Sequence, residues 1–424
     1  MKKCAFTICA KNYIGLAKVL EQSFIKHNPN VDFYIFIADE LSDEQRKLCH
    51  SNILPAKDVL ACRAELWEEM SFKYDIVEFC TAIKPLCFKH VFDKGYKKAL
   101  YFDPDILFYS NIEEAWQILD NYCTLVTPHL AYPYITITEK ETDDHGMLSS
   151  GVYNLGFIGL KDSDSVRRLL TWWSDRLSHH CVSEIQDGFF TDQKWMDWLP
   201  WILNNGELYV SRHLGWNIAP WNLKERKVIK QDTSYHILLK RDETIVHPLV
   251  FFHYSAVNYK DLLKGIYRNR NFEMDTEDNY LIELLTIYGE HIRESDFTAY
   301  LSWPYTYNCF SNGDSIQLSH RRIYKRLTDE GICYSNVFSS EGVFYRMLKK
   351  RKLLFQSNNS PERMKADKVS NYGRKIAVFD QLSYLFVRII GFERYTMLCR
   401  FLTHYLKKKN YVRLLGKAYR KFPV

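Results

Sequence analysis

Apolar residues follow two alternating patterns along the first part of the chain. Residues 3–10 and 31–38 are short, almost continuous apolar runs, whereas residues 12–27 carry apolar side chains at positions 13, 16, 17, 20 and 24. A continuous run is typical of a strand buried on both faces, and spacings of three and four are typical of a helix with one apolar face. This strand, helix, strand order predicts a parallel sheet covered by helices on both sides.

The same patterns predict elements further along the chain. A helix is expected over residues 79–93, with Pro85 either tolerated in its first turn or marking its true start. Residues 98–109 are interpreted as a strand, an acidic corner and a second apolar run. Further strands are expected at 123–128, 152–160, 207–210 and 246–254, and helices at 164–178, 191–203, 279–295 and 319–328.

The alternation of strands and helices stops near residue 265. We therefore predict an α/β domain over residues 1–265, with a Rossmann-like and mainly parallel central sheet. A helical extension over 266–340 and a helical tail over 341–424 are expected to follow, the tail being interrupted by a polar linker at 356–362.

Composition adds an asymmetry of charge. The chain has 424 residues, of which 46% are hydrophobic and 15% aromatic, and this balance excludes wholesale disorder. Residues 341–424 hold 20 Lys and Arg against 5 Asp and Glu, whereas the remainder holds 37 against 46. A basic tail on an acidic body indicates a polyanionic partner, either a membrane surface or nucleic acid.

Cysteine usage and hydropathy bear on the location of the protein. The 11 Cys are odd in number and form no CxxC pair, which argues against a disulfide framework or a Cys-based zinc site. No signal peptide is visible, and no stretch of 20 or more residues is free of charged side chains. A cytoplasmic protein without a transmembrane helix is therefore expected.

The candidate chemistry begins with Asp103-Pro104-Asp105, which follows the apolar run 99–102. In an extended chain, residues i and i+2 point to the same side, so both carboxylates converge at the carboxyl end of a strand, where open α/β sheets bind ligands. Two carboxylates suit Mg²⁺ or Mn²⁺ better than zinc. An isolated DxD is usually a surface turn, but the apolar strand before this one favours a cation site.

Taken in order, the motifs YFDPDILF, GVYNLGFIGL, TDQKWMD and FFHYS resemble those of nucleotide-sugar-dependent glycosyltransferases of the GT-A fold. The likeness covers roughly residues 1–260 and is greatest to family-eight-like bacterial enzymes that build surface polysaccharide. It implies transfer of a sugar from a nucleoside diphosphate sugar, with a UDP-hexose favoured, to a glycan or lipid-linked acceptor. Retention of the anomeric configuration is favoured by the same likeness.

The resemblance also implies a set of metal ligands. Asp103 and Asp105 match the carboxylates that bind the divalent cation, with Asp103 also touching the donor, and His253 matches a third protein ligand. The family usually has an HFxGxxKPW-like stretch here, whereas this chain has HYSAVNYK. A histidine on an apolar strand is often a satisfied core residue, and that alternative stays open for His253.

Four further residues match positions near the donor in the resembled family: Ala10, Asn12, Lys84 and Asn154. Three of them have structural alternatives. Asn12 would cap the following helix, Lys84 would be solvated on its helix, and Asn154 would mark a bulge in its strand.

Asp192 and Gln193 match a pair that lies beside the anomeric carbon and the acceptor, and they are the predicted catalytic residues. Alternatively, Thr191 or Asp192 caps the helix expected over 191–203. Packing is favoured over stacking on a sugar for the nearby tryptophans, of which the first three form a core stripe: Trp195, Trp198, Trp201, Trp216 and Trp221.

Two other classes compete with a glycosyltransferase. A metal-dependent nucleotidyltransferase or phosphotransferase would use the same DxD, but no GxxxxGK[ST] loop accompanies it. A nucleic-acid-binding protein would use the basic tail, but no helix-turn-helix, zinc finger, RRM or KH motif is present, and the acidic body would repel a polyanion. The tail suits peripheral attachment to the anionic inner face of the plasma membrane, with a solvated basic helical domain as the alternative.

Overall fold

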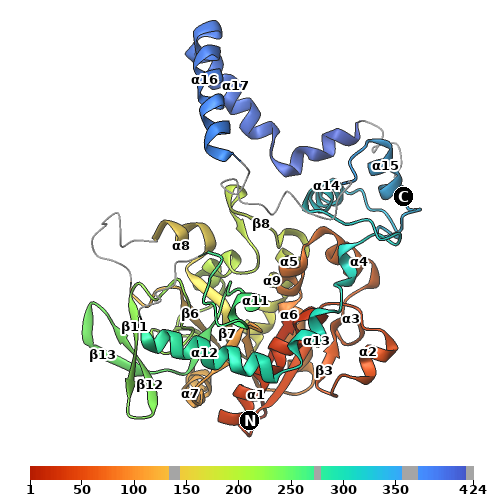
Figure 1. Ribbon diagram of the computed structural model, residues 1–424. Helices are drawn as coiled ribbons and strands as arrows, with labels where there is room; N and C mark the ends of the chain where they lie inside the picture. Colours follow the sequence, from red (N-terminus) through yellow and green to blue (C-terminus); the bar gives the residue numbers. More distant parts are fainter. Residues whose placement is uncertain (133–143, 272–277, 356–370, 417–424) are drawn as a thin grey trace. The chain divides into compact units, whose positions relative to one another are not determined.

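The computed structural model describes residues 1–132, 144–271, 278–355 and 371–416. Contacts divide the chain into two compact units (Figure 1), of which the first holds Met1–Arg63 and Ile76–Tyr305 and the second holds Ala64–Asp75 and Thr306–Val424. The roles predicted for three ranges of the chain stay a prediction: an α/β domain over 1–265, a helical extension over 266–340 and a helical tail over 341–424. Their bounds differ from those of the packing units, because the chain as far as Tyr305 packs with the first unit.

The first unit is built on a seven-stranded sheet in the order β10-β6-β7-β4-β1-β2-β3. β1 pairs in parallel with β2 and β4, β2 with β3, and β6 with β10, whereas β7 runs antiparallel to β4 and β6. The predicted α/β fold with a mainly parallel sheet is confirmed. The seven strands are β1 Lys3–Cys9, β2 Asp32–Ile37, β3 Ile53–Pro55, β4 Lys98–Phe102, β6 Thr124–Pro128, β7 Tyr153–Lys161 and β10 Leu208–Val210.

Helices cover both faces of this sheet. Successive residues of β1 point to opposite faces, and each face is buried against a different helix. Ala5 shares an apolar core with Leu20 and Phe24 of α1 (Ile14–His27). The ring of Phe6 instead lies 4.7 Å from that of Phe88 on α6 (Lys84–Asp93), which packs against α9 (Asp164–His180). The nearly continuous apolar character of the strands follows from burial on both faces.

Further helices and strands complete the first unit. Its other helices and 3₁₀ turns are η1 Lys11–Tyr13, α2 Asp43–Lys47, α3 Ala56–Val59, α5 Ile76–Ala82, α7 Glu113–Asn121, α8 Asp144–Ser150, η2 Ile185–Asp187, η3 Lys194–Trp198, α10 Leu199–Ile202, α11 Tyr259–Leu262, α12 Asn279–Glu294 and α13 Phe297–Leu301. Its other strands are β5 Ile106–Phe108, β8 Ser183–Glu184, β9 Phe189–Phe190, β11 Arg226–Gln231, β12 Ser234–Leu239, β13 Asp242–Pro248 and β14 Phe251–His253.

Two predicted elements are divided in the structure. The helix expected over 79–93 is α5 and α6, and Pro85 lies in the first turn of α6, where its missing N–H has no helical partner to lose. The strand expected over 246–254 is the end of β13 and all of β14. β13 joins β11 and β12 in a separate antiparallel sheet that the sequence analysis did not predict.

The predicted helix over 191–203 is confirmed only over residues 194–202, and its core stripe is wrong for Trp198 and Trp201. The segment forms only the 3₁₀ turn η3 and the single turn α10, in which Trp198 is 56% exposed and Trp201 is 87% exposed. Met196 and Leu199 fill the buried side of this segment, whereas Trp195 is half-buried, packs against Trp172 and donates to the carbonyl of His180 at 3.1 Å. The packing expected for the two later tryptophans is confirmed, because both are buried: Trp216 and Trp221.

The second unit has its own apolar core around Phe72 of α4 (Ala64–Lys73). The ring of Phe72 lies 4.9 Å from that of Tyr324 on α14 (Leu318–Asp329) and 5.4 Å from that of Phe344 on α15 (Val343–Lys350). The buried guanidinium of Arg321 donates to the carbonyl oxygens of Ser71, Phe72 and Tyr74, at the end of α4, and to that of Tyr307 in η4 (Thr306–Asn308). One arginine therefore ties α4 to helices encoded far away in the sequence.

The second unit also contains a helical hairpin, α16 (Tyr372–Ile390) and α17 (Phe392–Tyr405), whose helices lie side by side in Figure 1. Neither helix has a buried residue. The chain then returns to the core of the second unit in η7 (Lys408–Leu415), where Val412 and Leu415 are buried. Among the described residues, no helix is both long enough and apolar enough to cross a membrane.

Candidate cation site at the carboxyl edge of the sheet

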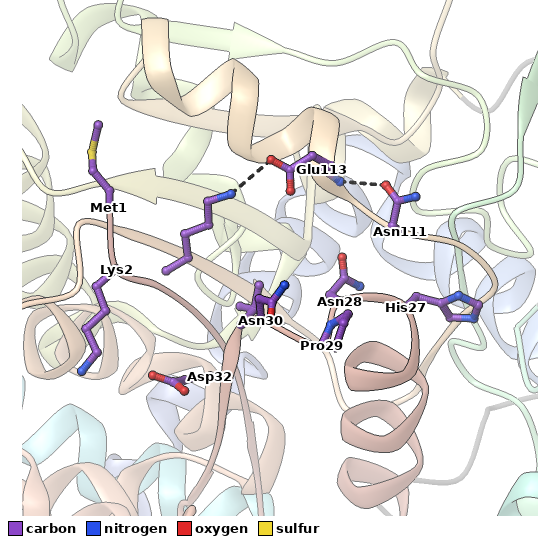
Figure 2. A pocket seen from close by; sticks show the side chains of 11 residues that line it. Met1, Lys2, His27, Asn28, Pro29, Asn30, Asp32, Asn111 and Glu113 are labelled. Carbon is purple, nitrogen blue, oxygen red and sulfur yellow. Dashed lines mark hydrogen bonds and ion pairs between the residues drawn. The ribbon is translucent and has the colours of Figure 1, made fainter.

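The two ends of the central sheet differ in their polar groups. A pocket of about 630 Å³ lies at the amino ends of β1 and β2 (Figure 2). Several of its polar side chains are paired within the protein: Lys3 with Glu113 at 3.2 Å, and Asn28 with the carbonyl of Phe24 and the amide of Ile112. The residues predicted from sequence gather instead at the carboxyl edge.

The DxD corner is formed where β4 ends at Phe102 and β5 begins at Ile106. β14 pairs antiparallel with β5 and sets His253 opposite Ile106. The amide of Tyr254 donates to the carbonyl of Asp105 at 2.8 Å. A two-stranded ribbon thus brings a histidine from late in the sequence against the two aspartates.

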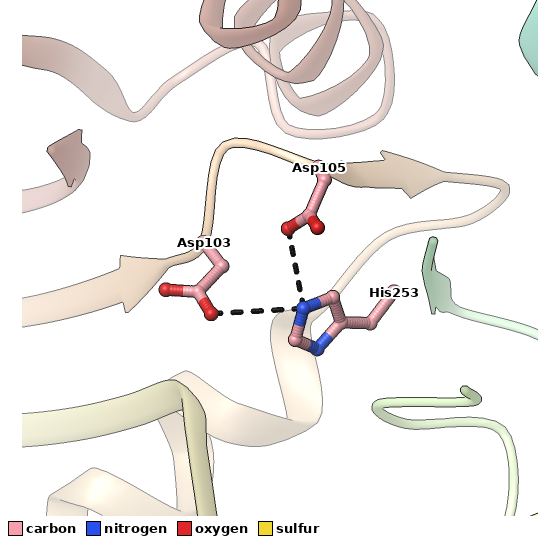
Figure 3. A group of neighbouring side chains, drawn as sticks. All are labelled: Asp103, Asp105 and His253. Atoms are coloured by element: carbon pink, nitrogen blue, oxygen red, sulfur yellow. Dashed lines mark ion pairs between the residues drawn. The ribbon is translucent and has the colours of Figure 1, made fainter. Parts of the chain in front are cut away.

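Figure 3 shows both carboxylates pointing at one imidazole nitrogen. His253 Nε2 lies 3.2 Å from Asp105 Oδ1 and 3.6 Å from Asp103 Oδ2. One ligand atom from each of the three residues lies within 4.8 Å of the others. The imidazole is buried and the carboxylates are half-buried, so the structure brings together the three predicted ligands in a group that could hold a divalent cation.

The charges of this group favour a cation. Removal from solvent raises the pKa of Asp103, and the neighbouring Asp105 acts in the same direction, against the positive charges of Lys84 and His253. Burial alone would lower the pKa of His253, but the two carboxylates raise it by more. The group therefore holds an excess of negative charge that a divalent cation would balance.

The surroundings of His253 fit a metal-ligating imidazole. Its Nδ1 lies 3.1 Å from Oδ1 of Asn217, the kind of contact that orients a ligating histidine. A Cβ on Gly156 would lie 2.5 Å from His253 Cε1, so only glycine allows β7 to approach the ring this closely. Trp221 meets the ring edge-on at 5.3 Å. The histidine is therefore fixed in place with Nε2 directed at the aspartates.

Polar side chains from β6 and β7 meet at the same edge. β7 runs antiparallel to β4, so Asn154 near its start lies at the carboxyl end of β4, and His129 follows the end of β6. Asn154 Nδ2 lies 3.2 Å from His129 Nε2, and Asn154 Oδ1 accepts from Asn217 Nδ2 at 3.0 Å. Burial lowers the pKa of His129 to about 4, so this imidazole is neutral at physiological pH.

Lys84 is buried, so the alternative in which it is solvated on its helix is wrong. Its ammonium donates to Asp192 Oδ2 at 2.5 Å and to the carbonyl of Leu155 at 2.9 Å. It also lies 4.1 Å from the ring centre of Tyr101, whose hydroxyl donates to Asp103 Oδ1 at 2.6 Å. Packing of α6 against the sheet directs this lysine inward, one side chain away from the DxD.

Asp192 and Gln193 lie in a constrained turn. Gln193 Oε1 accepts from the amide of Leu155 at 3.1 Å, and its Nε2 donates to the carbonyl of Ser150 at 2.9 Å. Thr191 has φ 46°, a conformation that costs a β-branched residue about 1–3 kcal/mol. The alternative role of Asp192 as a helix cap is wrong, because Gln193 precedes η3 and no side chain caps it.

Ala10 and Asn12 lie where β1 ends, at the same edge of the sheet. Asn12 is inside η1, and neither η1 nor α1 has a side-chain cap, so the capping alternative for Asn12 is wrong. Its Oδ1 is buried without a hydrogen-bond partner among the described residues. A buried acceptor of this kind fits a polar ligand.

Asn217 and His129 belong to the site but were not predicted from sequence. Asn217 belongs to GWNIAPWNL, where only the tryptophans were considered. His129 directly follows a predicted strand, the same signal that pointed to the DxD, and could have been found in that way.

Comparisons with known proteins give distant relatives. No protein-family model matches the chain. It is 25% identical over 264 residues to the uncharacterized protein YfnF of Bacillus subtilis (strain 168), over 59% of this chain and 80% of YfnF. It is 26% identical over 184 residues to the uncharacterized protein YfnD of the same bacterium, over 42% of this chain and 53%, about half, of YfnD.

The solved structures to which the chain is similar include glycosyltransferases. The galactosyltransferase LgtC, in complex with donor and acceptor sugar analogs, is 16% identical with a TM-score of 0.41, over 68% of this chain and 95% of LgtC. Mouse xyloside xylosyltransferase 1 is 12% identical with a TM-score of 0.31, over 52% of this chain and 88% of that protein. These likenesses concern the fold.

Proposed function

We propose that the protein is a metal-dependent glycosyltransferase that uses a nucleoside diphosphate sugar. The observation that carries the proposal is the cluster of Asp103, Asp105 and His253 at the carboxyl edge of a mainly parallel sheet. Its hard oxygen ligands suit Mn²⁺ or Mg²⁺. A cation bound there would neutralise the charge that develops on the departing diphosphate.

The residues around the cluster have distinct proposed roles. Asp103, Asp105 and His253 hold the cation, and Asp103 also contacts the donor. Lys84 supplies positive charge beside the DxD and orients Asp192, with which it is paired. The remaining donor contacts are proposed to come from the ends of β1 and β7, where these residues lie: Ala10, Asn12 and Asn154.

Asp192 and Gln193 are proposed to flank the reacting carbon and the acceptor. Because the Asp192 carboxylate is buried and paired, it is better suited to stabilising positive charge on the sugar than to taking a proton. This favours a retaining reaction, in which the departing phosphate takes the acceptor proton. The donor is proposed to be a UDP-hexose, and the acceptor a glycan or lipid-linked glycan of bacterial surface polysaccharide.

Ligand-dependent thermal stability tests this function. In the presence of Mn²⁺, one class of UDP-, GDP- or CDP-sugar is expected to raise Tm, because a ligand that binds only the folded state stabilises it by about 2.7 kcal/mol at 100 times its Kd. Proton NMR of the product would then report the anomer. A nucleoside triphosphate that stabilises the protein when no nucleotide sugar does would favour a nucleotidyltransferase instead.

Attachment to an anionic membrane surface is proposed for the hairpin of α16 and α17. Residues 371–416 hold nine Lys and Arg against two Asp and Glu. Large apolar side chains are exposed on both helices, among them Phe379 at 69%, Ile389 at 70% and Phe392 at 72%. Apolar groups flanked by basic ones suit an anionic bilayer, where each basic residue contributes about 1 kcal/mol. This surface would bring the enzyme to a lipid-linked acceptor.

Vesicle sedimentation tests this attachment. The protein is expected to bind phosphatidylglycerol-containing vesicles at low salt and to be released at high salt. The triple variant Phe379→Ser, Ile389→Ser and Phe392→Ser is expected to bind at least about tenfold more weakly, because each apolar side chain contributes about 1.5–3 kcal/mol on burial. Leu48→Ser, 66% exposed on the first unit, serves as the matched control. Wild-type protein that stays in the supernatant at low salt contradicts the proposal.

A further inference from the structure

We propose that Asn217 is a positioning residue that keeps the Nε2 lone pair of His253 directed at the cation and joins this ligand to Asn154. The inference rests on the proposed function, because it assigns a role to Asn217 at the same site. Asn217 is 2% exposed, and its amide is hydrogen-bonded on both sides. No family motif in the sequence pointed to it.

The direction of each hydrogen bond follows from one backbone amide. The N–H of Gly156 can only donate, and it lies 3.0 Å from Oδ1 of Asn154, which is therefore an acceptor. Asn217 Nδ2, 3.0 Å from that same oxygen, must then be the donor group. A second contact agrees, since Asn217 Nδ2 also donates to the hydroxyl of Thr127 at 3.0 Å.

The orientation of the Asn217 amide fixes that of the imidazole. With Nδ2 turned toward Asn154, Oδ1 faces His253 Nδ1 at 3.1 Å and can only accept. Nδ1 must carry a proton, so in the neutral ring the lone pair lies on Nε2, which faces the aspartates and a cation bound between them. The chain of bonds from Gly156 to His253 therefore selects the ring tautomer that a metal ligand needs.

The backbone of Asn217 adopts an unusual conformation that is consistent with this orientation of its side chain. Its φ is 53°, in the left-handed region that asparagine tolerates better than most residues. Its carbonyl accepts from Asn222 Nδ2 at 2.9 Å, and the next residue, Ile218, accepts from the amide of His253 at 2.6 Å. The loop and β14 are thus joined, so the amide of Asn217 and the ring of His253 keep a fixed separation.

The test replaces Asn217 with glycine. Glycine adopts a positive φ without steric cost, so Asn217→Gly removes the side chain and spares the backbone conformation. We expect the Kd for Mn²⁺, measured by titration calorimetry on the full chain, to rise about 10–100-fold. The Tm of the cation-free protein is expected to fall as well, because buried partners of Asn217 lose hydrogen bonds, so the Kd is measured well below the unfolding transition. An unchanged Kd for Mn²⁺ would overturn the inference.

A measurement on the wild-type protein keeps the inference testable if the variant folds poorly. In histidine-¹⁵N-labelled protein loaded with Mg²⁺, the His253 resonances, assigned with His253→Gln, are expected to show a protonated Nδ1 and an unprotonated Nε2. The opposite tautomer would overturn the role of Asn217. Failure of the proposed function is distinct from either result, because wild-type protein would then bind Mn²⁺ without being stabilised by any nucleotide sugar.

Discussion

Replacing Asp105 with asparagine is expected to lower kcat/KM for sugar transfer by about 10²–10³-fold, the loss typical of removing one electrostatic group from a transition state. The variant keeps the shape of the side chain and removes the charge that lies 3.2 Å from His253. Two neutral ligands and one carboxylate hold a divalent cation poorly, so the Mn²⁺ concentration needed for half-maximal activity is expected to rise as well. Initial rates measured across a Mn²⁺ titration separate these two effects.

The matched control for this experiment is Asp232→Asn. Asp232 is exposed in the turn between β11 and β12 and has φ 53°, a conformation that asparagine also accepts. It should leave the rate and the Mn²⁺ dependence unchanged. Full activity of the wild-type enzyme in EDTA would contradict both the cation site and the function proposed from it.

Breaking the buried pair of Lys84 and Asp192 is expected to lower the free energy of unfolding by about 3–5 kcal/mol, because Lys84→Met leaves the Asp192 carboxylate buried without its partner. Activity should be lost as well, since the ammonium lies against Tyr101, which donates to Asp103. Urea unfolding of the variant and steady-state rates measure the two effects.

The double variant Lys84→Met with Asp192→Asn separates stability from catalysis. It removes both charges, so most of the lost stability is expected to return, because an uncharged pair has no unpaired charge to bury. Transfer activity should stay low. A double variant that regains wild-type rates would show that the pair serves only the fold, and it would contradict the roles proposed for both residues.

Part of the candidate site could be predicted from local sequence alone. The DxD directly follows an apolar strand, so local sequence predicted both aspartates at the carboxyl end of that strand, where the structure holds them in a turn. The parallel sheet was predictable for a similar reason, since burial on both faces leaves continuous apolar runs such as residues 3–10. These features depend on neighbours in sequence.

Other parts of the site depend on contacts between distant segments. The sequence of α6 reads as an ordinary amphipathic helix, and only its packing on the sheet shows that Lys84 is buried against Asp192. The same holds for Asn217, whose loop is an irregular stretch until it pairs with β14. The burial of Trp198 was predicted wrongly for a related reason. The way in which η3 packs on the core buries Met196 and leaves Trp198 exposed.

Local sequence specifies the alternation of strands and helices, the acidic corner that offers two ligands, and the basic, apolar character of the last helices. Each of these is a property of residues close together in the chain, where periodicity and charge act directly. Three other features depend on tertiary contacts. His253 joins Asp103 and Asp105 as a third possible ligand, and Asn217 orients the His253 ring. The helix α4 belongs to the second unit through contacts of Phe72 and Arg321. Those outcomes depend on burial and hydrogen bonding between segments far apart in sequence, which no local pattern specifies.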